Sequence, residues 1–170
     1  MRWTEASAAA LASAACRLCR GAGCEPGPAA VSVVPCACVC RRVFRVCYGR
    51  FRTCAAADSF ARTVAYREVP RGVDRRIVWC RNNEDYCADF AAAGRRSLAP
   101  DLHRVFRFYY LLGGDAPLVA SRLGVTRTVF FRSLLEVEAV VGGEIALMKP
   151  YSLYPPYEYM RGGTRAADVA

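Results

Sequence analysis

The stretch Ala120-Ser121-Arg122-Leu123-Gly124-Val125-Thr126 predicts the end of one short helix, a tight turn and the start of another helix. Val119 and Leu123 are apolar at helical spacing. Gly124 supplies the left-handed residue that commonly ends a helix, and Thr126 is a good N-cap for the helix that follows. Two helices that cross steeply need a small residue at the crossing and a glycine in the turn, so the pattern is typical of a helix-turn-helix.

The second helix of this motif is expected over about residues 126–141, with Phe130, Leu134 and Val137 on its buried side. A recognition helix contacts base edges through residues near its N-terminus. The candidate DNA-binding residues are therefore Thr126, Arg127, Thr128, Phe131 and Arg132. The alternative is an ordinary helical hairpin in a small α-helical domain.

A second motif lies near the N-terminus, where Cys16-Arg17-Leu18-Cys19 is followed by Arg20-Gly21-Ala22-Gly23. Two cysteines separated by two residues and followed by glycines predict a zinc knuckle, because the bend aims both thiolates at one metal ion and backbone N–H groups at the sulfurs. One such pair supplies half of a four-ligand site, so another pair is expected beyond the loop at residues 25–28.

That second pair is expected in Cys36-Ala37-Cys38-Val39-Cys40, after a short strand over residues 31–34. The favoured zinc ligands are Cys16, Cys19, Cys36 and Cys38; Cys40 is a possible substitute in the second pair, and Cys24 is a weaker one. The spacing of the second pair departs from the usual two intervening residues. A set of reduced, buried cysteines without metal is the alternative.

A helix is expected from Cys40 to about Ala57, with one apolar stripe that includes Val43, Val46 and Phe51. Cys47 and Cys54 lie on this stripe and are expected to pack in the core. Five arginines lie largely off the stripe and are candidates for contact with nucleic acid or RNA polymerase: Arg41, Arg42, Arg45, Arg50 and Arg52. They would otherwise form a solvated face.

The remaining segments complete a mainly α-helical fold with a small zinc-knuckle module and a helical helix-turn-helix domain. We expect a metal-binding module with its basic helix over 1–57, a linker or irregular segment over 58–81, the helix-turn-helix domain over 82–148 and an extended aromatic and proline-rich arm with a tail over 149–170. Asn82 or Asn83 is expected to cap the first helix of the second domain. The arm is expected to fold back on the helical core.

The net charge of +9 is concentrated near the N-terminus, because residues 1–57 carry eight Arg against two Glu. Such a surplus suits phosphate backbones or acidic protein surfaces. No apolar run is long enough to span a bilayer, and Glu5 interrupts the weakly apolar N-terminus, so a signal peptide is not expected. Ten cysteines in a chain without a secretion signal favour metal binding in the cytoplasm over disulfides.

The segment over about residues 84–145 resembles the fourth region of bacterial sigma factors, through a helix over 102–113 followed by the helix-turn-helix. Residues 16–23 resemble the C-x-x-C-x-G-x-G knuckle of the DnaJ cysteine-rich domain, which repeats the knuckle four times, whereas this chain has it once. A knuckle ahead of a sigma-like helix-turn-helix resembles phage late-gene antitermination proteins of the Q type and related prophage regulators. The resemblance implies that the protein binds promoter DNA and paused bacterial RNA polymerase. It also implies that the polymerase then transcribes through terminators.

The sequence thus predicts a DNA-binding transcription regulator in the cytoplasm of a bacterial host cell, with Zn²⁺ as a structural cofactor and with neither membrane nor small-molecule partners. The alternative is a non-transcriptional DNA-binding module, such as the small subunit of a phage DNA-packaging terminase. An enzyme is not expected, because Asp85 and Asp89 share a helix face without a further acidic or histidine partner. The basic segment over 1–57 is separate in sequence from the expected recognition helix at about 126–141, which predicts two different partners. It also predicts that DNA binding survives removal of residues 1–57.

Overall fold

The computed structural model describes residues 3–25, 33–65, 75–149 and 152–160; for 58–65 and 75–82 it describes the backbone only. The elements in chain order are α1 (Glu5–Leu11), β1 (Cys24–Glu25), β2 (Val34–Pro35), α2 (Ala37–Ala65), α3 (Arg75–Ser97), α4 (Pro100–Val105), the π-helical segment η1 (Phe106–Leu111), α5 (Ala116–Leu123), α6 (Arg127–Leu147) and α7 (Pro156–Met160). The fold is mainly α-helical, as the sequence predicts, and the two strands are two residues each.

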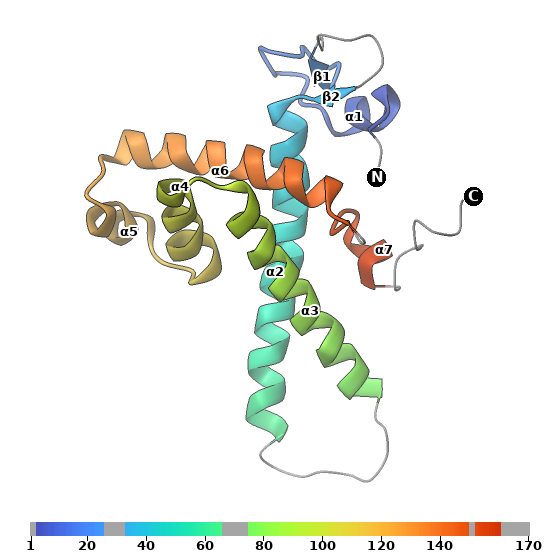
Figure 1. Cartoon of the computed structure of the whole chain (residues 1–170), viewed down its shortest axis with the longest axis vertical. Coiled ribbons are helices and arrows are strands. Elements are labelled where there is room, and N and C mark those ends of the chain that lie inside the picture. The colour runs from blue at the N-terminus through green and yellow to red at the C-terminus, as the bar shows by residue number, and fades with distance from the viewer. Residues whose placement is uncertain (1–2, 26–32, 66–74, 150–151, 161–170) are drawn as a thin grey trace.

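Helix α2 is the central column of the molecule, with α6 lying across it and α3 running down beside it (Figure 1). Its buried face follows the predicted stripe at Val43, Cys47 and Phe51. Val46 was expected on this stripe but is 40% exposed, and Phe44 is fully buried in its place. Position 44 follows 40 and precedes 47 at helical spacing, so it faces α3 and α6, whereas position 46 turns outward.

One core joins α2 to the helix-turn-helix region. Phe44 contacts the rings of Phe90 in α3 and Phe106 and Tyr110 in η1, with ring centroids 4.8–6.5 Å apart. The same core cluster contains Val137, Val141 and Ile145 of α6, which are fully buried. Residues 1–57 thus supply a wall of the core against which α6 packs. The described residues of the expected helix-turn-helix domain thus share one core with α2, and removing α2 would expose their buried side chains to solvent.

The expected linker over 58–81 contains the end of α2 and the start of α3. Its remaining part, residues 66–74, lies outside the described residues. Asn83, expected as a helix cap, lies within α3 and is 1% exposed. Its Oδ1 accepts a hydrogen bond from the Cys54 thiol at 3.3 Å, so the residue ties α3 to α2 rather than beginning a helix.

Helices α2 and α6 approach closely where they cross. Gly142 of α6 faces the backbone carbonyl of Cys40, and a Cβ atom at position 142 would overlap that oxygen. A glycine lets the two backbones come into direct contact, which larger residues prevent. The crossing places the start of α2, and with it the cysteine-rich module, against the C-terminal half of α6.

The C-terminal arm folds back on the core, as expected, over its described residues 152–160, but it is not extended throughout, because Pro156–Met160 form α7. Leu153 is fully buried, and its carbonyl accepts a hydrogen bond from the Cys47 thiol at 3.5 Å. The Tyr159 hydroxyl donates to the Asp89 carboxylate at 2.8 Å. Residues 150–151 and the tail at 161–170 lie outside the described residues.

None of the helices in the described residues combines the length and the apolar character needed to cross a membrane.

Candidate functional site

The first half of the cysteine cluster is a tight knuckle between α1 and β1. The Arg20 N–H donates to the Cys16 carbonyl at 2.9 Å and the Ala22 N–H donates to the Cys19 carbonyl at 2.8 Å. Arg20 and Gly21 have φ values of 50° and 91°, the left-handed region that lets the chain reverse behind the second cysteine. Cys16 and Cys19 therefore face the same side of the turn.

The second half comes from the start of α2. The Gly23 carbonyl accepts a hydrogen bond from the Cys36 N–H at 2.9 Å, next to the antiparallel pair of β1 and β2. This pairing brings Cys36 to the position before α2 and Cys38 into its first turn, beside the knuckle. A helix N-terminus favours negative charge, so it is a suitable place for thiolate ligands.

The four favoured cysteines gather in one cluster that could hold a metal ion. The sulfur atoms of Cys16, Cys19, Cys36 and Cys38 all lie within 4.8 Å of one another. The distance is 3.8 Å from Cys16 Sγ to Cys36 Sγ and 3.6 Å from Cys19 Sγ to Cys38 Sγ. A tetrahedral ion with metal–sulfur bonds of about 2.3 Å separates its sulfurs by about 3.8 Å, so the residues present fit a four-coordinate, closed site.

The thiols of the cluster have unequal pKa values. Backbone N–H groups of Cys19 and Leu18 point at the Cys16 sulfur and lower its pKa to about 6. Burial raises the pKa of Cys36 to about 12 and also raises the pKa of Cys38. Four thiolates this close together require a cation to offset their mutual repulsion, and a divalent metal ion supplies that charge.

The two spare cysteines do not join the cluster. Cys40 was the possible substitute, but its buried thiol points to the Pro35 carbonyl at 3.9 Å. Position 40 is two residues beyond Cys38 on a helix, a rotation that turns it away from the knuckle and toward α6. The Cys24 thiol donates to the Ala22 carbonyl at 3.7 Å. The short spacing of Cys36 and Cys38 works because Cys36 precedes the helix and Cys38 lies in its first turn.

The helix-turn-helix has the geometry that its sequence predicts. Gly124 ends α5 in the left-handed conformation with a φ of 66°. The Thr126 side chain then caps α6 by accepting a hydrogen bond from the Val129 N–H at 3.4 Å. Val119, Ala120 and Phe130 are buried between the two helices and η1. The sequence signals for this motif are thus local ones that the structure retains.

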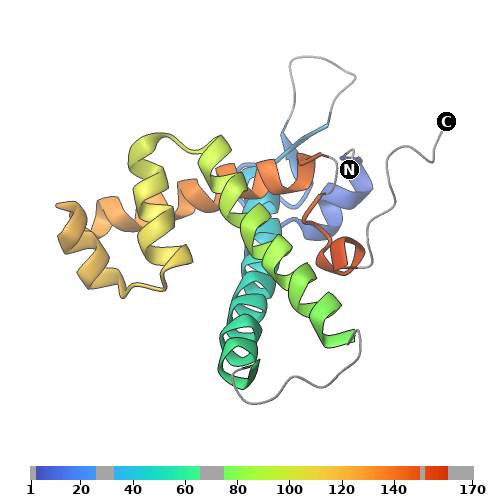
Figure 2. The ribbon, with the colours of Figure 1, turned by 60° about the horizontal axis from the view of Figure 1, so that its bottom comes forward.

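The expected reading residues lie on the exposed surface at the start of α6. Thr126, Arg127, Thr128 and Arg132 are exposed, and Phe131 is 43% exposed. The Arg127 guanidinium lies over the Phe131 ring, 5.6 Å from its centroid, one helical turn away. This end of α6, together with α5, projects away from α2 and the cysteine-rich module (Figure 1, Figure 2).

The five arginines of α2 do not act as one surface. Arg45 donates to Glu138 of α6 at 3.0 Å and forms an ion pair with it at 2.9 Å. Arg50 is half-buried and donates to the Asn83 Oδ1 at 3.5 Å, so it belongs to the contact between α2 and α3. Arg52 is exposed farther along α2. Arg41, Arg42 and Arg45 share one concave surface, which also includes Arg17.

Sequence reasoning missed two parts of this arrangement. Glu138 accepts hydrogen bonds from both Arg45 and the Tyr110 hydroxyl, the latter at 3.1 Å, and so links α2, η1 and α6. Arg17 joins the arginines of α2 although it lies in the knuckle. No local pattern reveals either contact, because both depend on how distant segments pack.

Comparisons of the chain with protein families, curated proteins and solved structures found no significant match.

Proposed function

We propose that this chain is a DNA-binding transcription regulator that acts on bacterial RNA polymerase, as an antiterminator at phage late genes. The observation that carries the proposal is the capped, exposed start of α6 behind the left-handed turn at Gly124. A helix presented in this way can enter the major groove with its first turns. Arg127 and Arg132 would contact bases or phosphates, and Thr128 and Phe131 would assist, Phe131 by contact with a thymine methyl.

The metal that we propose for the cysteine cluster is Zn²⁺. Four cysteine thiolates in a closed tetrahedral set are the usual ligands of structural zinc. The knuckle and the start of α2 contribute two ligands each, so the ion would link two segments that are otherwise joined by a two-residue strand pair. Its role here is structural, because all four coordination positions are taken by the protein.

Two partners are supported by the distance between the two candidate surfaces. The reading residues lie at one end of α6, and the metal module with its arginines lies beyond the crossing of α6 and α2 (Figure 1). Phosphate contacts hold the register of a DNA-binding helix, so a protein that bound only DNA would gain by placing its charge beside that helix. We infer that the module contacts the polymerase complex while α6 contacts DNA.

DNA reading is tested by selecting binding sites from a pool of random duplexes with the full chain. Arg127→Ala should then weaken binding to the selected site by about 1–3 kcal/mol and relax its sequence preference, as expected for a lost guanine contact. The matched control is Arg107→Ala, which removes an exposed arginine of η1. A chain that selects no duplex, or an R127A variant with full affinity and unchanged preference, would contradict the assignment of α6 as the reader.

Antitermination is tested by transcription in vitro with bacterial RNA polymerase through a terminator placed downstream of the selected site. We expect read-through with the full chain and none with R127A. Deletion of residues 1–57 is unsuitable as a test because it would remove the part of the core that α2 forms. The point variant R127A is used in its place. Duplex binding without any effect on transcription would instead favour the DNA-packaging alternative.

A further inference from the structure

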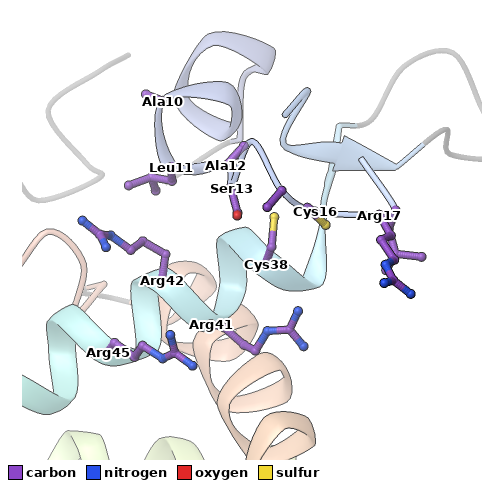
Figure 3. Close-up of a pocket in the computed structure, with 12 residues that line it drawn as sticks. Ala10, Leu11, Ala12, Ser13, Cys16, Arg17, Cys38, Arg41, Arg42 and Arg45 are labelled. Carbon is purple, nitrogen blue, oxygen red and sulfur yellow. The ribbon is translucent and has the colours of Figure 1, made fainter. Parts of the chain in front are cut away.

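A groove of about 730 Å³ runs between the N-terminal segment and the first turns of α2. Figure 3 shows its two walls: α1 and the following residues lie on one side, and α2 lies on the other. The first wall contributes small and apolar side chains, among them Leu11, Ala12 and Ala15. The second wall contributes Arg41, Arg42 and Arg45, and Arg17 lies at the knuckle end. Among the described residues, no aspartate or glutamate lines this groove.

The arginines of the groove differ in whether an acidic side chain of the protein already forms an ion pair with them. Arg45 forms its ion pair with Glu138 and keeps a side chain that is 60% exposed. Arg17, Arg41 and Arg42 have no ion-pair partner within the described part of the chain. Their charges are therefore available to an anion, and in a concave surface such charges attract it more strongly than on a flat one.

The metal site accounts for only part of this charge. A divalent ion with four thiolates carries a net charge of −2, and Arg17 and Arg41 are the arginines nearest to Cys16 and Cys38 in the chain. Arg42 points away from these cysteines, toward the end of the groove at Leu11 (Figure 3). Positive charge thus extends along the groove beyond what the metal centre needs.

The arrangement of the guanidinium groups indicates the shape of the ligand. In Figure 3 the groups of Arg17, Arg41 and Arg42 are spread along the groove and do not converge on one point. A single phosphate would need converging donors, whereas a chain of phosphates offers one negative charge for each guanidinium. The groove volume of about 730 Å³ also lies within the range of about 300–1,000 Å³ that is typical of sites for small ligands. A groove of this volume is too small to admit a duplex.

We propose that this groove binds the phosphate backbone of a single-stranded nucleic acid. The strand lies between the arginines of α2 and the apolar wall, with its phosphates on Arg17, Arg41 and Arg42. The described lining residues include no aromatic ring on which bases would stack, so recognition is of the backbone and independent of sequence. An acidic peptide is the less suitable occupant, since its carboxylates lie at the ends of side chains, whereas the guanidinium groups are spread along the groove in the way that backbone phosphates are.

This site goes beyond the proposed function and does not depend on the reading helix. The test measures binding of the zinc-loaded full chain to labelled oligouridine and oligothymidine of about 12 nucleotides, a length within known single-strand site sizes. A perfect duplex and polyglutamate serve as competitors. The test variant is R17Q/R41Q/R42Q, and the matched control R95Q/R104Q/R107Q removes the same charge from exposed positions outside the groove.

The groove variant should lower the magnitude of the salt slope of log K by about 2, because each single-strand phosphate contact contributes about 0.7. At 0.1 M salt this corresponds to a loss of about 100-fold in affinity, while the control and R127A bind nearly as the parent chain does. The metal content of every variant is measured, and Arg42→Gln alone, the substitution farthest from the metal site, should show about a third of the change in slope.

Three results would overturn the proposal: equal losses in the groove and control variants, competition by polyglutamate as strong as by the oligonucleotides, or retention of full affinity by the groove variant. Binding of oligouridine in clear preference to oligothymidine would identify a transcript as the ligand. Equal binding of the two would show that the groove accepts RNA and DNA single strands alike. If R127A abolishes duplex binding but leaves oligouridine binding intact, the two sites are separate.

Discussion

At the scale of single residues, the cysteines divide into ligands and packing residues. Cys16→Ser and Cys19→Ser should each abolish stoichiometric metal binding, because a structural site with three thiolates loses most of its affinity. Elemental analysis of protein purified without chelator should find about one zinc per parent chain, as expected for one four-ligand site. Cys24→Ser is the matched control, since Cys24 lies in β1, directly after the knuckle in the chain, but outside the cluster.

Cys47→Ser and Cys54→Ser should retain the metal and show only losses of stability, because both thiols are buried in the contacts of α2. A parent chain that contains no zinc and melts as the loaded protein does would contradict the metal assignment.

Tyr86 gives the protein a specific sensitivity to alkali. Its side chain is fully buried, and its hydroxyl donates to the Cys47 carbonyl at 3.3 Å. Burial raises the pKa of this phenol well above its ordinary value of 10.0. Since the folded-state pKa is the higher one, its contribution to stability is complete below pH 10 and is lost as the pH rises above it.

The free energy of unfolding should therefore fall by up to about 1.4 kcal/mol per pH unit above pH 10 because of Tyr86 alone. Denaturant unfolding at pH 9 and pH 11 measures this loss. Tyr86→Phe should be less stable at neutral pH, through loss of a hydrogen bond worth about 1 kcal/mol, yet show the smaller loss between the two pH values. An identical pH dependence in both proteins would refute the role of this phenol.

At the scale of elements, the crossing of α2 and α6 depends on Gly142. Gly142→Ala should destabilise the protein by about 1–3 kcal/mol or more, because the added Cβ meets the backbone carbonyl of Cys40, which cannot rotate away. Gly49→Ala is the matched control in α2, where a Cβ would meet no atom within 4 Å. There the better helix propensity of alanine should stabilise by about 0.5–1 kcal/mol.

Both variants can be compared by thermal melting with their metal content measured in parallel. If Gly142→Ala melts as Gly49→Ala does, then the two helices do not pack as closely as the structure has them.

The sequence predicts an element well when neighbouring residues decide its structure, and poorly when residues far away in the chain decide it. The turn at Gly124, the cap at Thr126 and the knuckle glycines are decided by neighbours in the chain, and the structure has them as predicted. Asn83 resembles a helix cap locally, but its hydrogen bond from Cys54 comes from a residue far away in the sequence. Likewise, nothing near Arg17 shows that it shares a groove with Arg41.

At the scale of the whole molecule, the metal module and the helical core should respond differently to removal of the metal. The core cluster lies within residues 43–153 and contains none of the four clustered cysteines. In the part of the chain that the structure describes, the knuckle is held mainly by α1 and the two-residue strand pair. Local unfolding can therefore leave a larger cooperative unit intact.

A zinc chelator should thus abolish amide protection over residues 5–25 while most of it remains in α3 and α6. Hydrogen exchange followed by mass spectrometry measures this, and far-ultraviolet circular dichroism should keep most of the helical signal. Unfolding of the entire chain on chelation would show that the metal holds the core as well as the module.

The continuity of α6 also limits how the chain can change in length. Thr128, at the exposed end, and Gly142, at the crossing, are separated by an unbroken stretch of one helix, about 21 Å at 1.5 Å per residue. Inserting one residue between them would turn the exposed end by about 100° relative to α2. Descendants of this chain can therefore gain or lose residues in the turn at 124–126 far more readily than within α6, where only changes of about seven or eleven residues would nearly restore the original orientation.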